Sequence, residues 1–511
     1  MEIVLIVSGV WVLYSRTWLS KDRAYPIIDD SVRRWGYLYD VPITSPPPAF
    51  YSTRQHPWRH FFLILVHCLN VIVIDQIWGW QVAALFAFCP LSVNGAAWIT
   101  GGYYAVTMFL SLTAVYFIYN FYNIFGMAVA SLFFTAALGS TITCIGVPFV
   151  FLLMGKWKAT IMFWPLVMYL TGKRFRKGFF IRNYGNADRF ELKKIPVMIK
   201  VMAYYIRLTV FPDKLAFFRE FGSGFNSSDV VRKDLQSVNG LFWSSLLLVA
   251  VFIGAGVLTS PLGMIWFIVT LAPFTQFKIL GQFVAERYVY LPQLGVHLMI
   301  AALLKDHPIA LTVVLTAYVY RSHLYIPAFH DIASLYKNGI KNFPDCVSNY
   351  ANLGERHLHV GENYRGRRLF EEGLTKDPFS FLCHTNLAAY WIRVRNYPNA
   401  WNHTVMAIKD KKNKFAQELL MNQYVQLTNV LQERVNKRDE INKQLVMEGD
   451  LNVPMVQSEV MVKRDESNKE EGLAVPVEMS VPPMSEQSAA SRNPSSKDEV
   501  CSKSGSECLA V

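Results

Sequence analysis

Long apolar stretches alternate with shorter polar segments through residues 1–325 of this chain. Most of the stretches approach the length of about 20 residues that crosses the hydrocarbon core of a bilayer as a helix. The pattern predicts an all-α, polytopic membrane domain over residues 1–325, with about eleven spans. The predicted spans are 2–19, 60–78, 81–98, 102–121, 125–154, 157–172, 197–212, 241–259, 262–280, 287–304 and 308–325.

The number of crossings depends on the segment 125–154, which is apolar throughout. It is either one bent helix broken at Gly139 and Ser140 or two short half-spans. The densest cluster of Lys and Arg, residues 173–194, belongs to the cytoplasm by the positive-inside rule. If 125–154 crosses once, the amino terminus is also inside. The loop 20–59 and everything after residue 325 then lie outside, opposite the basic cluster.

A period of 34 residues follows the last span: Pro344 recurs as Pro378, and Gly339 recurs as Gly373. This is the tetratricopeptide period, in which pairs of helices stack into a concave surface that holds a peptide or protein. We expect repeats over 326–414, with an incomplete first copy that shares its first helix with the last span. Phe370 and Trp391 should lie in their core.

Beyond the repeats, the chain becomes steadily more polar. Residues 415–446 are predicted to form one polar helix that caps the repeats. Residues 447–511 are rich in Ser, Pro, Glu and Lys and predict a disordered tail.

Composition agrees with a membrane protein, since 52% of the residues are hydrophobic and only 17% are charged. The net charge of +12 does not indicate nucleic acid, because the basic residues cluster beside apolar spans, where they anchor to lipid headgroups. The seven cysteines are scattered without metal-ligand spacing, so no metal and no bound cofactor is predicted.

Two adjacent carboxylates, Asp29 and Asp30, lie in the loop after the first span, beside several arginines. A carboxylate close to a bilayer is partly desolvated and can serve as a general base. The alternative is that the pair caps a short helix, since Asp is a good N-cap residue.

The order of several short elements resembles the transmembrane and tetratricopeptide-repeat O-mannosyltransferases, which belong to the GT-C glycosyltransferases. The elements are the Asp29-Asp30 loop, Gln81 to Pro90, Ala97 to Gly101, Ala203-Tyr204-Tyr205 to Pro212, Pro273-Phe274, Val284-Ala285-Glu286-Arg287-Tyr288-Val289-Tyr290-Leu291-Pro292, and then the repeats. The resemblance covers roughly residues 20–414. The string from Val284 to Pro292 is its most specific part.

The resemblance implies that Asp29 or Asp30 is the catalytic base and that the donor is a polyprenyl-phosphate sugar. The leaving lipid phosphate needs positive charge, which Arg287 would supply, with Glu286 orienting it. The alternative for Glu286 and Arg287 is a structural ion pair at a helix end. The chain departs from the family at Thr141-Ile142, where relatives have Lys-Glu. It departs again near Phe217-Phe218, where an acidic residue is expected.

Two function classes follow. The first is an enzyme that transfers a sugar, with mannose as the first candidate, from a lipid-linked donor to a hydroxyl, such as a protein Ser or Thr held by the repeats. The second is a non-catalytic membrane scaffold whose repeats recruit a protein partner. A transporter is a third, less supported class, because charge and broken helices at mid-membrane are sparse. The expected location is the endoplasmic reticulum membrane in a eukaryote or the cytoplasmic membrane in a bacterium.

Overall fold

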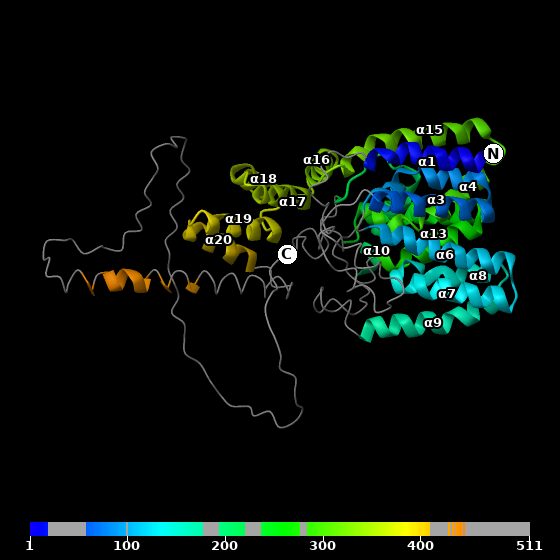
Figure 1. Ribbon diagram of the computed structural model, residues 1–511, viewed down its shortest axis with the longest axis horizontal. Coiled ribbons are helices and arrows are strands. Elements are labelled where there is room, and N and C mark those ends of the chain that lie inside the picture. Colours follow the sequence, from blue (N-terminus) through cyan, green and yellow to red (C-terminus); the bar gives the residue numbers. More distant parts are fainter. Residues whose placement is uncertain are drawn as a thin grey trace, which may run out of the picture. The chain divides into compact units, whose positions relative to one another are not determined.

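The structure is a computed structural model that describes residues 1–18, 58–98, 101–176, 194–219, 237–275, 284–408 and parts of 428–444. All regular secondary structure in these residues is helical, which confirms the all-α class (Figure 1). The described helices from α1 (Glu2–Trp18) to α20 (Tyr397–Ile408) belong to one compact unit, Met1–Lys437. The predicted disordered tail, 447–511, and most of the predicted capping helix lie outside the described residues.

The apolar part of this unit contains thirteen α-helices and five short 3-10 helices in its described ranges. The α-helices are α1 (Glu2–Trp18), α3 (Trp58–Trp78), α4 (Trp80–Phe88), α5 (Val93–Ala97), α6 (Gly102–Asn120), α7 (Ile124–Ser140), α8 (Val147–Leu153), α9 (Trp157–Arg176), α10 (Ile195–Val210), α12 (Gly240–Thr259), α13 (Pro261–Leu271), α14 (Gln293–Leu303) and α15 (Pro308–Tyr325). Of these, α5 and α8 are short helices between longer ones. The 3-10 helices are η3 (Pro90–Ser92), η4 (Ile142–Gly146), η7 (Ala272–Phe274), η8 (Glu286–Val289) and η9 (Ile326–Phe329).

Fewer helices than predicted are long and apolar enough to cross a membrane. In the described ranges there are four, or five if the pair Trp80–Phe88 and Pro90–Ala97, bent by 60°, is one broken span. The bend lies at Pro90, which has no backbone N–H to donate. The expected count of about eleven is not reached in these ranges, because several apolar segments are too short. The 11 residues of α14, for example, rise only about 16 Å, against a hydrocarbon core of about 30 Å.

Segment 125–154 turns back on itself instead of crossing once. It breaks after Ser140, where predicted, into α7, η4 and α8. Pro148 O at the start of α8 accepts a hydrogen bond from Thr160 Oγ1 of α9 at 2.9 Å, and Phe151 O accepts one from Lys156 N at the intervening turn. α8 therefore runs antiparallel to α9.

α7, by contrast, runs parallel to α9. Lys158 N donates to Tyr122 Oη at 3.1 Å, which places the start of α9 beside the connection between α6 and α7. Farther along, the rings of Phe134 and Phe163 lie 4.9 Å apart. The end of α9 therefore lies at the opposite end of the bundle, where α6 begins.

We call this end of the bundle the repeat end. It holds the starts of α3 and α6, because Gly102 packs against Leu63, and it holds the end of α9, where the basic cluster begins. The prediction that the basic cluster lies opposite the first loop and the repeats depended on 125–154 crossing once, and this segment turns back instead. α9 therefore ends on the same side as the start of α3, while residues 19–57 and 177–193 themselves lie outside the described residues.

Within residues 326–408, where repeats are predicted, the structure has five α-helices. They are α16 (Ile332–Asn342), α17 (Val347–His359), α18 (Asn363–Lys376), α19 (Phe381–Arg393) and α20 (Tyr397–Ile408). Phe370 is fully buried, with Trp391 packed at the edge of the same cluster, and Gly361 has a positive φ of 85° in the turn between α17 and α18. The core position predicted for Phe370 is confirmed, whereas Trp391 is only partly buried. The starts of α17 and α18 recur 34 residues later as the starts of α19 and α20.

Candidate functional site

The turn η8 lies at the repeat end and carries two of the four predicted site residues, Glu286 and Arg287. The other two, Asp29 and Asp30, lie outside the described residues. On the amino-terminal side of the turn, Ala285 N donates to Tyr205 Oη at 3.0 Å. This bond fixes the chain as it enters the turn.

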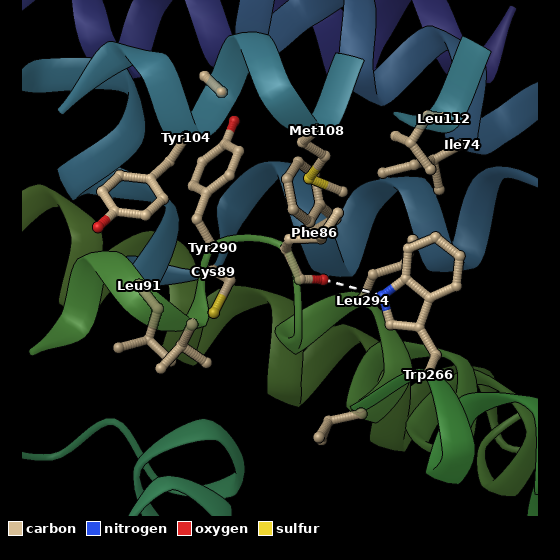
Figure 2. Packing of buried hydrophobic residues seen from close by; sticks show 14 of the residues in the cluster. Ile74, Phe86, Cys89, Leu91, Tyr104, Met108, Leu112, Trp266, Tyr290 and Leu294 are labelled. Atoms are coloured by element: carbon tan, nitrogen blue, oxygen red, sulfur yellow. Dashed lines mark hydrogen bonds between the residues drawn. The ribbon is translucent and has the colours of Figure 1, made fainter. Parts of the chain in front are cut away.

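On the carboxyl-terminal side, the ring of Tyr290 fixes the chain. It lies against Gly95, where any side chain would collide with it, and 5.4 Å from the ring of Phe86 (Figure 2). Its hydroxyl bonds His67 Nδ1 at 2.7 Å, and His67 Nε2 bonds Ala87 O at 3.2 Å. The dashed bond of Figure 2, from Trp266 Nε1 to the carbonyl of the next residue, Leu291, holds the chain farther on at 3.0 Å.

The Glu286 carboxylate is 1% exposed and accepts hydrogen bonds from four groups. Asn94 Nδ2 and Tyr325 Oη each donate to Oε2 at 2.7 Å. Ala216 N donates to Oε1 at 2.7 Å, and Arg219 Nη2 donates to the same oxygen. A buried charge is tolerated when it is paired and hydrogen-bonded, and Glu286 meets both conditions.

The ion-pair partner of Glu286 in the described structure is thus Arg219, itself 2% exposed. Its Nη1 donates to Tyr204 Oη at 3.0 Å and its Nη2 to Lys214 O at 2.7 Å, while its guanidinium carbon lies 5.1 Å from the ring centroid of Phe343. Burial lowers the pKa of Arg219, but the Glu286 carboxylate and Tyr204 raise it more. The net pKa of Arg219 is therefore above its ordinary value, and the guanidinium stays charged.

The Arg287 guanidinium is half-buried and lies among aromatic rings. Its carbon is 5.0 Å from the ring centroid of Tyr288, 5.3 Å from Phe217 and 5.5 Å from Trp98. Such contacts stabilise a cation by about 0.5–2 kcal/mol each.

Sequence reasoning found Glu286 and Arg287 through the specific string around them, but it missed Arg219 and the ring of Phe217. Phe217 had been noted only as a departure from the family, at a position where an acidic residue was expected. In the structure its ring packs against the Arg287 guanidinium. No group of three or more His, Cys, Asp or Glu that could hold a metal ion occurs in the part of the chain that the structure describes.

Comparisons of the chain with protein-family models, with curated proteins and with solved structures found no match. The function is therefore inferred from the residues of the chain itself.

Proposed function

We propose that the protein is a membrane glycosyltransferase that moves a sugar, with mannose as the first candidate, from a polyprenyl-phosphate donor to a hydroxyl acceptor. The observation that carries this proposal is the placement of Arg287. A guanidinium lies among three ring faces at one end of an apolar helical bundle, on a turn that buried hydrogen bonds fix. Such an arrangement suits recognition of a phosphate at a membrane surface, because the cation is preorganised before the anion arrives.

In this mechanism, the acceptor hydroxyl attacks the anomeric carbon while the bond from that carbon to the lipid phosphate breaks. Arg287 stabilises the negative charge that develops on the phosphate oxygens. Asp29 or Asp30 takes the hydroxyl proton, and one carboxylate within hydrogen-bonding distance suffices for an inverting displacement. The repeats hold the protein or peptide that carries the hydroxyl.

The first test is sugar transfer by the purified protein in detergent, offered several polyprenyl-phosphate sugars. Arg287→Lys keeps the charge but loses the planar fork and should weaken donor use, and Arg287→Ala should weaken it further. Arg207→Ala is the matched control, because Arg207 pairs with Asp213 on an exposed surface and should leave transfer unchanged. Full turnover per folded molecule in Arg287→Ala would remove this residue from the donor site.

The second test concerns the base. Asn is close in size to Asp and still caps a helix, so Asp29→Asn and Asp30→Asn remove basicity while leaving a capping role intact. One of the two should lose about 10²–10⁴-fold in rate, and the other should be mild. If both variants keep full activity, this loop does not contain the base.

A non-catalytic scaffold is the second candidate, and one observation favours it. Leu215 O, in the loop that contacts Glu286, accepts hydrogen bonds at 2.8 Å from Asn338 and Asn342 of α16. A scaffold that presents its repeats to a partner needs such a fixed attachment between the repeats and the membrane domain. Absence of wild-type transfer from every donor offered would favour this candidate over the enzyme.

A further inference from the structure

The loop Lys214–Arg219 lies between the turn η8 and the first repeat helices and contacts both. On the side of the turn, Ala216 N and Arg219 bond the Glu286 carboxylate, and the Phe217 ring lies 5.3 Å from the Arg287 guanidinium carbon. Three residues of this loop therefore define the surroundings of the two charged residues of η8.

On the side of the repeats, the intervening residues of the same loop make the contacts. Leu215 O accepts from Asn338 Nδ2 and Asn342 Nδ2, each at 2.8 Å. The Phe218 ring stacks on Tyr336 of α16, with centroids 6.0 Å apart and planes inclined by 11°. Leu215 and Phe218 thus contact the repeats, whereas Ala216 N and the Phe217 ring contact the turn.

Arg219 closes the loop by joining both sides in one side chain. It pairs with Glu286, and its guanidinium also lies over the ring of Phe343, the residue that follows α16. Leu215, Ala216, Phe217 and Arg219 are each at most 4% exposed. Close packing of buried residues transmits a displacement from one neighbour to the next.

We propose that Arg219 is a positioning residue for Arg287, and that the loop Lys214–Arg219 couples the repeat helix α16 to the turn that carries Arg287. A displacement of α16, such as one caused by a protein bound to the repeats, shifts Ala216, Phe217 and Arg219 together and so moves the donor-contacting cation. The part of this proposal that concerns donor binding rests on the proposed transferase function. The mechanical coupling does not.

The coupling is tested by loosening the loop from the repeats without altering the turn. In the double variant Asn338→Ala, Asn342→Ala, both bonds to Leu215 O are lost. Amide hydrogen exchange at residues 284–290 should then accelerate by about 5-fold or more, in the range typical of coupled sites. Asn352→Ala is the matched control, because the Asn352 amide bonds Ser348 O within its own helix α17, and it should leave that exchange unchanged.

The donor readout is a separate measurement on the same proteins. If Arg287 is displaced, the KM for a polyprenyl-phosphate sugar should rise by about 5-fold to 150-fold, with a smaller change in kcat. Arg219→Lys keeps the charge beside Glu286 but cannot reproduce the planar contacts to Tyr204 and Lys214 O. It should therefore show the same KM effect in milder form.

The outcomes separate the two proposals. Faster exchange at 284–290 together with a raised KM supports both. Faster exchange in a protein that transfers no sugar supports the coupling and counts only against the transferase. Unchanged exchange in the double variant overturns the coupling. If the double variant does not fold, the same exchange is measured in Asn342→Ala alone. Exchange at 284–290 that stays at the wild-type rate in this single variant also overturns the coupling.

Discussion

The pair formed by Glu286 and Arg219 should dominate the stability of the repeat end. Each carboxylate oxygen of Glu286 accepts hydrogen bonds from two donors. In Glu286→Gln, one of these oxygens becomes an NH₂ group that cannot accept a hydrogen bond, so the two donors to that oxygen lose their acceptor. The charge of Arg219 is also left buried without a counter-ion. Removing one partner of a buried pair destabilises a protein by about 3–5 kcal/mol, a large part of a total stability of about 5–15 kcal/mol.

The double variant Arg219→Met, Glu286→Gln separates the stranded charge from the lost hydrogen bonds. With neither charge buried, much of the stability should return, and the two single changes should not be additive. The measurement is unfolding of each purified variant in detergent by heat or denaturant. Arg207→Met, which breaks an ion pair with side chains 51% and 52% exposed, serves as control and should cost about 0–1 kcal/mol. A Glu286→Gln protein as stable as wild type, or a double variant no more stable than Glu286→Gln, would refute the reasoning.

Three further predictions concern the repeats and the orientation of the chain. Phe370→Ala should destabilise the repeats by about 3–5 kcal/mol and sensitise residues 347–408 to protease, and unchanged sensitivity would contradict the assigned core. Burial, with a contribution from His384, lowers the pKa of His403 to about 4, so the folded repeat keeps this imidazole neutral while the unfolded chain binds a proton near pH 6.5. Repeat stability should therefore fall as pH decreases from 7 toward 4, and His403→Asn should weaken that dependence in a protease-resistance assay at each pH; equal slopes in both proteins would exclude His403 as the cause. Cysteines introduced at Tyr364, which is 66% exposed, and at Lys177 should be labelled from one side of the membrane, and a cysteine at Lys305 from the other. If the cysteines at positions 177 and 305 are labelled from the same side, the assigned directions of the helices are contradicted.

Local periodicity predicted those parts of the fold that depend on residues close in sequence. The bend at Pro90 follows from a missing backbone donor, and the positive φ of Gly361 follows from the turn that the 34-residue register requires. The core position of Phe370 follows from the same register. Each of these features can be read from a short window of sequence.

Features that depend on contacts between distant segments could not be predicted in this way. Arg219 and Glu286 are 67 positions apart, and no spacing rule links a loop arginine to a particular carboxylate. The path of 125–154 could not be predicted from the sequence either, because a segment that crosses the membrane once and a segment that turns back have the same hydropathy. Its direction follows from contacts to α9, such as the bond between Thr160 and Pro148 O.

The direction of α9 has a consequence for the donor. The repeat end includes the end of α9, where the basic cluster 173–194 begins, and the start of α3, which follows the basic loop 20–59 in the sequence, whereas the opposite end has Lys156, Lys158 and Lys305. Lys and Arg in short connections set orientation, so this asymmetry predicts that Arg287 and the repeats face the cytoplasm. The GT-C resemblance implies the opposite side for the catalytic loop. Because a lipid phosphate remains at the headgroup level of one leaflet, Arg287 reaches only donors displayed on its own face. Labelling at Tyr364 from the cytoplasmic side would therefore require a donor whose sugar faces the cytoplasm. Labelling from the other side would require a translocated donor and would mean that the basic cluster does not orient this chain.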